Sequence, residues 1–184
     1  MFCRLLIVLV FLLGAMPVAA QQVYETTAGT VRFFSNTQQE LIKASSDKLQ
    51  GVVDVKEKRF AFRVEIGTFL GFNNPLQRDH FNENYMESEQ YPIATFTGKI
   101  VEDVDLLANG KHKLRAKGKL SIHGVEQERI LYVIVTMKDG RMEVTSEFTV
   151  PLIDHSIKIP RVVYEKLATE INVFVAATLQ PRQS

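Results

Sequence analysis

Histidine, carboxylate and hydroxyl side chains are the groups in this 184-residue sequence whose chemistry could support catalysis or metal binding. The four histidines are His80, His112, His123 and His155. No two of them have the spacing of a compact metal site, such as two histidines on one helical turn. We therefore expect no metal site and interpret the histidines as structural or solvent-exposed side chains.

The tripeptide Asp154-His155-Ser156 contains the residue types of a hydrolytic triad. Adjacent residues of an extended chain point to opposite faces, and triads are assembled by geometry from separate parts of a fold. The sequence contains no glycine-rich phosphate loop and no Gly-x-Ser-x-Gly elbow. These features predict a protein that is not an enzyme and needs no cofactor. A hydrolase or metal enzyme stays an alternative only if histidines and carboxylates converge at one end of the fold.

The most unusual charged cluster is Arg78-Asp79-His80, which lies between the apolar residues Leu76 and Phe81. Ion pairs on an exposed helical face are common, so local pairing is the simpler interpretation. The alternative is a polar clamp at the mouth of a pocket. In that case Arg78 and His80 are the candidate contacts for the headgroup of a ligand.

The elements that must position these residues are predicted to be β-strands, because the dominant hydrophobic period is two. Between residues 59 and 66 every second side chain is apolar, namely Phe60, Phe62, Val64 and Ile66. Residues 113–122 and 141–150 alternate in the same way. Each strand therefore has one apolar face and one polar face.

Turn residues predict how these strands are connected. Asn109-Gly110 and Asp139-Gly140 favour the positive φ angles of two-residue hairpins, and His123-Gly124 is a third candidate turn. The turns predict a four-strand meander formed by residues 93–107, 111–123, 126–137 and 141–150. Further strands are predicted near residues 30–36, 41–45, 49–55, 58–68 and 171–179.

Eight or nine strands are too many for a strongly twisted sheet to stay open, and closure removes the exposed edges. The predicted fold is therefore all-β, an up-and-down antiparallel barrel of about eight strands. A face-to-face sandwich is the alternative, but consecutive hairpins favour the barrel over Greek-key connections. A short helix beginning near Pro75 is predicted over one end of the barrel, and a second helical turn within residues 161–168.

The inward faces of this barrel combine bulky apolar residues with small ones. Gly98, Ala116, Gly118 and Ser146 are small, and small residues that face a barrel axis leave room for a ligand. An apolar interior favours an apolar ligand, because each buried methylene contributes about 0.8 kcal/mol. The residues predicted to line the ligand are Phe60, Phe62, Val64, Phe96, Leu114, Ala116, Leu120, Val144, Phe148 and Val173. The alternative is a filled core in a structural or stress-related interaction protein without a ligand.

Residues 1–20 have the pattern of a cleavable signal peptide. Arg4 precedes an apolar run over residues 5–13, and residues 18–20 (Val-Ala-Ala) place small side chains before a cleavage site. The run is shorter than the about 20 apolar residues that a membrane span needs. We therefore expect residues 21–184 to form one domain, periplasmic or secreted, with no transmembrane segment in the mature chain.

The charge of the mature chain is expected to be balanced. Cleavage removes Arg4 from the 22 Lys and Arg residues and leaves 21, which equals the 21 Asp and Glu residues. A nucleic-acid-binding domain normally has a basic excess, so no nucleic-acid partner is expected. Cys3, the one cysteine, leaves with the signal peptide, so the mature chain forms no disulfide. The sequence leaves the oligomeric state open, including a dimer.

Three stretches of the sequence together resemble the YceI-like family of exported lipocalin-like proteins. In chain order they are QRDHFNENYMESEQYPIATFTGKI, KLRAKGKLSIHGVEQERILYVIV and EFTVPLIDHSIKIP, and the resemblance covers nearly all of residues 21–179. It implies a lipocalin-like barrel whose elongated apolar tunnel holds a polyisoprenoid, an isoprenoid quinone or a similar amphiphilic lipid. It also implies a closing helix and loop near residues 78–86, with His80 and Phe81 matching a His-Leu position of the family. The chain departs from the family pattern in having Asp79 directly before His80, where a residue commonly intervenes.

Overall fold

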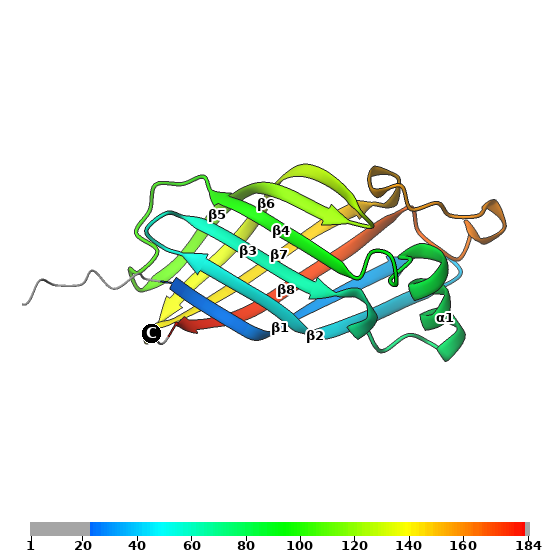
Figure 1. The fold of residues 1–184 in the computed structure, drawn as a ribbon, viewed down its shortest axis with the longest axis horizontal. Helices are drawn as coiled ribbons and strands as arrows, with labels where there is room; N and C mark the ends of the chain where they lie inside the picture. The colour runs from blue at the N-terminus through cyan, green and yellow to red at the C-terminus, as the bar shows by residue number, and fades with distance from the viewer. Residues whose placement is uncertain (1–22, 183–184) are drawn as a thin grey trace, which may run out of the picture.

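A computed structural model describes residues 23–182 of the chain, so the predicted signal peptide lies outside the described residues. Eight antiparallel strands follow one another around a closed barrel, and the last strand pairs with the first (Figure 1). The strands are β1 (Val23–Asn36), β2 (Leu41–Asp54), β3 (Arg59–Glu65), β4 (Ile93–Ile100), β5 (Gly110–Ile122), β6 (Val125–Lys138), β7 (Arg141–Pro151) and β8 (Glu170–Pro181). The predicted up-and-down barrel is confirmed.

The short helical segments all lie at one end of the barrel, which we call the helical end (Figure 1). They are η1 (Ile66–Thr68), α1 (Pro75–His80), η2 (Phe81–Tyr85, a π-helical turn), η3 (Leu152–His155) and η4 (Arg161–Val163). The opposite end holds the first residue of β1 and the last of β8, and we call it the terminal end. In residues 23–182, no helix is both long and apolar enough to cross a membrane.

Helix α1 begins where the sequence predicts it. Asn74 is its N-cap and accepts a hydrogen bond from the backbone N–H of Gln77 at 2.9 Å, and Pro75 opens the first turn. The second predicted helical turn, within residues 161–168, also forms. It is η4, a single 3-10 turn over Arg161–Val163.

Strands β1 and β2 are longer than predicted, because an irregularity in their pairing shifts the alternation of side chains. The register changes on both sides of Gly29. In β2 the buried positions are Ala44 and Ser46 before the change, and Leu49, Gly51 and Val53 after it. A bulge moves every later side chain of the strand to the opposite face. The alternation of apolar residues along β2 therefore looks like that of two separate strands. The predicted strand start near residue 30 is wrong for the same reason.

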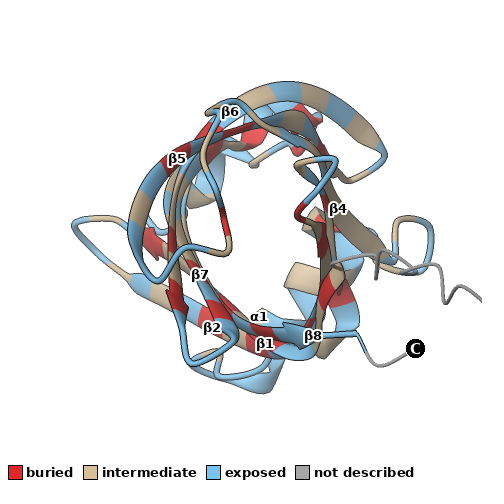
Figure 2. Ribbon diagram, turned by 90° about the vertical axis from the view of Figure 1, so that its left-hand side faces the viewer, coloured by how far each residue is buried: buried red, intermediate tan, exposed pale blue. Residues whose placement is uncertain are grey.

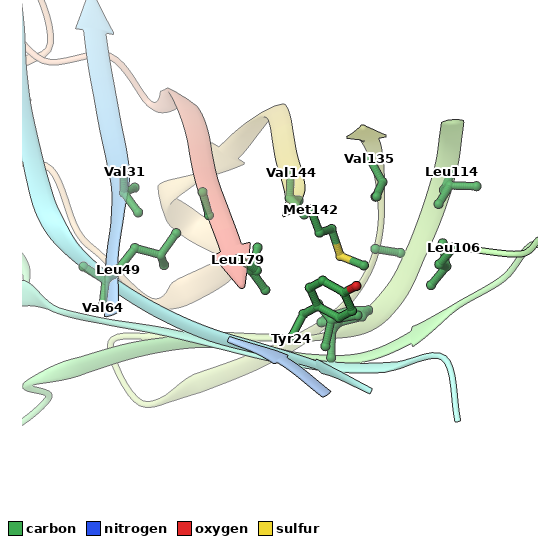
Figure 3. Packing of buried hydrophobic residues seen from close by; sticks show 14 of the residues in the cluster. Tyr24, Val31, Leu49, Val64, Leu106, Leu114, Val135, Met142, Val144 and Leu179 are labelled. Carbon is green, nitrogen blue, oxygen red and sulfur yellow. The ribbon is translucent and has the colours of Figure 1, made fainter. Parts of the chain in front are cut away.

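The terminal end of the barrel is filled by packed apolar side chains. Met142 and Leu179 are opposite each other on β7 and β8 and are 1% and 0% exposed. Tyr24 belongs to the same cluster and lies beside them (Figure 3). Leu106, 1% exposed, joins this cluster from the connection between β4 and β5. These side chains close the terminal end.

The connection between β4 and β5 replaces part of a predicted strand. β4 ends at Ile100, so the strand predicted to reach residue 107 is wrong in its second half, and Asn109-Gly110 does not form a two-residue hairpin. Glu102 explains the departure, because its carboxylate accepts the backbone N–H and the Nε–H of Arg115, both at 2.7 Å. The backbone N–H of Arg115 thus donates to the side chain of Glu102, whereas in a longer β4 it would donate to a backbone carbonyl of that strand.

The other two predicted turns are confirmed. Asp139 and Gly140 have φ angles of 50° and 73°, and His123 and Gly124 have 52° and 72°. Each pair directly joins two neighbouring strands, β6 to β7 and β5 to β6.

The backbone ladder between β6 and β7 covers only part of their length. Its last pair toward the helical end is Val133 with Ser146, and beyond it each strand pairs only with its other neighbour. Side chains span this region, which we call the β6–β7 seam. Ser146 Oγ donates to the carbonyl of Tyr132, and Arg129 Nη2 donates to the carbonyl of Thr149, each at 2.8 Å. The barrel wall is therefore held here by side chains.

Candidate ligand-binding site

An apolar cavity of about 380 Å³ lies inside the barrel. Residues from all eight strands line it. Figure 2 looks along the barrel and shows the strands arranged around its axis. It extends from Leu106 and Met142 at the terminal end to Gln77, His80 and Lys166 at the helical end. Its volume is in the range of small-molecule binding sites, roughly 300–1,000 Å³. The cavity is thus closed at one end and bordered by helical segments at the other.

Nine of the ten residues predicted to line a ligand lie in the cavity wall. They are Phe60, Phe62, Val64, Phe96, Ala116, Leu120, Val144, Phe148 and Val173. Leu114 points inward as predicted, but it is 3% exposed and packs in the core instead of bordering the cavity. The alternation of side chains identifies the inner face of a strand but not the depth of a residue along the barrel. Contact of these residues with a ligand stays a prediction.

Aromatic rings form one side of the cavity. The rings of Phe60 and Phe96 have centroids 4.9 Å apart across β3 and β4, and Phe62 lies 6.3 Å from Phe60. Gly51, opposite Phe62 on β2, makes room for that ring, because a Cβ atom at residue 51 would clash with it. Close aromatic packing makes this side of the wall apolar and rigid.

A second group of aromatic residues lies at the helical end and was not predicted. Phe33, Phe69, Phe72 and Phe81 all border the cavity, and Phe33 stacks on Phe81 with centroids 5.3 Å apart and an angle of 21°. Phe72 and Phe81 also meet, at 5.1 Å. A signal was present in the spacing Phe69-Leu70-Gly71-Phe72, just before the predicted helix. These rings line the cavity at the helical end.

The prediction that Gly98 and Gly118 leave room in the barrel interior is wrong. The two glycines are opposite each other in the ladder of β4 and β5. A Cβ atom at Gly98 would clash with the carbonyl of Lys117, and one at Gly118 with the carbonyl of Thr97. The glycines therefore permit a close approach of two strands, and neither borders the cavity. Ala116 and Ser146, the other small residues, do border it.

Several polar groups of the wall already have partners in the protein. Ser35 is fully buried, and its Oγ accepts the backbone N–H of Ala168 at 2.9 Å. Ser146 donates to Tyr132 across the seam. The carboxylate of Glu40 accepts a hydrogen bond from the side chain of Gln77. Pairing of these groups leaves an interior that offers a ligand mainly apolar contact.

The two predicted headgroup contacts occupy different places. His80 is the last residue of α1 and borders the cavity. Arg78 does not border it, and its Nη2 donates to the carbonyl of Gly67 at 3.1 Å. Further polar residues that border the cavity were not predicted, among them Tyr85, Lys166 and Arg63. A tyrosine hydroxyl is protonated at neutral pH, and burial raises the pKa of the Tyr85 phenol further above its ordinary value of 10.0.

The tripeptide Asp154-His155-Ser156 does not form a triad. His155 is 0% exposed, and its Nδ1 lies 3.1 Å from the carbonyl of Val125, whereas Asp154 is exposed and pairs with Arg129 at 3.9 Å. Burial lowers the pKa of His155, which favours the neutral ring. Within residues 23–182, no three His, Cys, Asp or Glu side chains gather as a metal site would require.

Comparisons with known proteins agree with this geometry. The model of the YceI-like domain matches residues 20–179. A polyisoprenoid binding domain from Saccharophagus degradans, implicated in plant cell wall breakdown, is similar in structure, with a TM-score of 0.73 and 17% identity over 88% of this chain and 99% of that chain. No curated protein matches the sequence.

Two further solved structures share the architecture. BcnA from Burkholderia cenocepacia has a TM-score of 0.68 and 14% identity, over 82% of this chain and 95% of that chain. The YceI protein of Campylobacter jejuni has a TM-score of 0.58 and 16% identity, over 86% of both chains. At these identities the solved structures show a common fold alone.

Proposed function

The chain belongs to the YceI-like family, and from this membership and its cavity we propose that it is an exported protein that binds and carries an apolar or amphiphilic lipid. The observation that carries the proposal is the apolar cavity of about 380 Å³ inside the barrel. A filled core would support the alternative, an interaction protein without a ligand. The cavity favours the carrier.

The shape and chemistry of the cavity suit a long hydrocarbon chain. It is closed by apolar side chains at the terminal end and bordered by aromatic rings along its length. Each methylene buried there contributes about 0.8 kcal/mol, against the entropy lost on immobilising the chain. We propose a polyisoprenoid or an isoprenoid quinone as the ligand class. The fold shared with the polyisoprenoid binding domain of Saccharophagus degradans supports this choice.

The headgroup of such a lipid would lie at the helical end, where the polar residues of the wall are found. His80, Tyr85 and Lys166 border the cavity there. We propose that His80 and the protonated Tyr85 meet the headgroup directly. Arg78, which holds the carbonyl of Gly67, would support the rim from outside.

Export and binding without catalysis complete the proposal. The signal-peptide pattern of residues 1–20 supports a periplasmic or secreted protein. Residues from all eight strands of one chain line the cavity, and we propose that a single copy holds the ligand. No cofactor is required for binding by burial of apolar surface.

Titration of delipidated protein with a long-chain polyprenol tests the proposal. Ala116 is 4% exposed and borders the cavity, so Ala116→Phe fills the space that a ligand would occupy. We expect the affinity to fall by about tenfold or more, which corresponds to about 1.4 kcal/mol. Lys117→Phe, an outward residue of the same strand, is the matched control and should bind as the wild type does. Absence of polyprenol binding, or equal binding by both variants, would overturn the proposal.

A further inference from the structure

Exposed apolar side chains are concentrated at the helical end. Of the nine large hydrophobic residues exposed within residues 23–182, six lie there. They are Leu41, Leu70, Leu76, Ile153, Val162 and Tyr164. Val162 and Ile153 are the most exposed, at 88% and 84%, and both belong to residues 152–169, which we call the η3–η4 lobe. Apolar side chains gathered on one surface mark an interaction site.

The η3–η4 lobe also has cations without partners. Lys158, Arg161 and Lys166 form no ion pair within the described residues. The lobe also contains two acidic residues. Asp154 lies 3.9 Å from Arg129, a cation outside the lobe, and Glu165 accepts a hydrogen bond from the neutral side chain of Gln39. The three cations outnumber these two acidic residues, so the lobe has a net positive charge beside exposed apolar side chains.

The α1 side of the helical end, formed by residues 66–92, has the other sign of charge. It contains one cation, Arg78, and the acidic residues Asp79, Glu83, Glu87 and Glu89. Glu87 is the one next to the lobe, because His123 contacts both its carboxylate and the carbonyl of His155. An anionic surface would therefore attract the η3–η4 lobe and repel the α1 side. The charges determine which side of the helical end would approach such a surface.

The same lobe forms part of the cavity wall. Val163, Lys166 and Leu167 border the cavity, whereas Val162 and Tyr164 are exposed to solvent. A surface that bound the exposed side of the lobe would therefore lie next to the helical end of the cavity. A bilayer that exchanged lipid with the cavity would have to lie at this same end of the barrel.

Resting on the proposed lipid-binding function, we propose that the η3–η4 lobe docks on an anionic phospholipid membrane. Ile153, Val162 and Tyr164 enter the interface between headgroups and acyl chains, and the three cations contact lipid phosphates. Interfacial binding of this kind combines buried apolar area with attraction between basic side chains and anionic lipids. Docking would place the helical end of the cavity against the bilayer, where lipid can pass between the two.

Vesicle flotation of the purified mature protein, residues 21–184, tests the docking surface. We expect binding to vesicles of phosphatidylcholine with phosphatidylglycerol, and little binding to phosphatidylcholine alone. Val162→Asp should weaken binding by about tenfold or more, because it places a charge in the apolar interface. Val101→Asp is the matched control, since Val101 is 46% exposed in the connection at the terminal end, and should leave binding unchanged.

Two double variants test whether the cations of the lobe contribute to membrane binding. Replacing Lys158 and Arg161 by Ala should weaken binding by about fivefold per cation, because each basic residue near the surface contributes about that factor. The control replaces Lys56 and Lys138, exposed residues at the terminal end, and should have no effect.

The same samples distinguish this proposal from the proposed function. If native mass spectrometry shows a bound lipid but the protein does not float with anionic vesicles, or Val162→Asp and Val101→Asp bind equally, docking by this lobe is overturned and the carrier function stands. If the protein neither contains a lipid nor takes one up, the carrier function fails, and docking as a route for lipid fails with it.

Discussion

The carboxylate of Glu87 lies 2.7 Å from Nε2 of His123, and this contact joins the connection after η2 to the turn between β5 and β6. Tyr91 strengthens the junction, because its ring lies edge-on to His123 with centroids 4.6 Å apart. A Cβ atom at Gly124 would lie 2.5 Å from the same ring. The chain that covers the helical end is thus fixed to the barrel wall through one tight turn.

Gly124→Ala is expected to be more destabilising than Gly140→Ala. Both glycines have positive φ, 72° and 73°, so each substitution costs about 1–2 kcal/mol for the left-handed backbone. Only Gly124 has Tyr91 against it, whereas a Cβ at Gly140 meets nothing within 4 Å. The clash should add about 1–3 kcal/mol. Urea unfolding of the two variants measures the difference, and equal losses would show that Tyr91 does not pack on the turn.

The sequence specifies turns such as this one because a positive φ is a local requirement. Asp139-Gly140 and His123-Gly124 were therefore predictable from residue type alone. The alternation of apolar residues likewise predicts which side chains of β3, β5 and β7 face inward. Nine of the ten predicted lining residues border the cavity for that reason.

Features that depend on contacts between distant residues were not predictable. The register change beside Gly29 involves two strands, so β2 has the pattern of two separate strands. Leu106 lies outside β4, although the predicted strand includes it, because Glu102 binds Arg115, thirteen residues away, and β4 ends before it. Gly98 and Gly118 resemble small cavity residues in the sequence, and only their pairing shows that they bring strands together. The alternation of side chains does not indicate how far along the barrel a residue lies. The sequence therefore could not predict that Leu114 packs in the core instead of bordering the cavity.

Arg129→Ala should weaken the β6–β7 seam. Its Nη2 donates to the carbonyl of Thr149 at 2.8 Å, and no backbone ladder joins the two strands at this level. Loss of a hydrogen bond from a charged donor costs about 1.5–3 kcal/mol. Arg63→Ala is the control, because Arg63 makes a surface ion pair with Glu65 beside intact ladders, and should cost at most about 1 kcal/mol.

Denaturant titrations would test the seam. A loss of stability no larger for Arg129→Ala than for Arg63→Ala would contradict a structural role for the seam side chains. Native-state hydrogen exchange should also show faster exchange in β6 and β7 of the Arg129 variant than in β2 and β3.

His155 should make the protein less stable in acid. Burial lowers its pKa below the ordinary value of 6.5, so the folded state binds the proton more weakly than the unfolded chain. The stability that comes from the neutral ring is therefore complete above about pH 6.5 and decreases as the pH falls toward the lowered pKa. Urea midpoints measured between neutral pH and mild acid should decrease in the wild-type protein.

Two variants assign this acid sensitivity to the buried ring. His155→Gln keeps a side-chain donor near the carbonyl of Val125 and removes the titrating group, so its midpoints should depend less on pH. His80→Gln changes an exposed histidine and should retain the wild-type dependence. The same pH dependence in His155→Gln and in the wild type would rule out His155 as the source.

Native mass spectrometry of protein purified without detergent from its own cells tests the central claim, the binding of a lipid inside the barrel, most directly. The account predicts an adduct of one lipid per protein that organic extraction recovers as a long-chain isoprenoid. The adduct should be absent from Ala116→Phe and present in Lys117→Phe, since only the first side chain points into the cavity. A clean mass of the unliganded protein, together with no uptake of added isoprenoids, would contradict it.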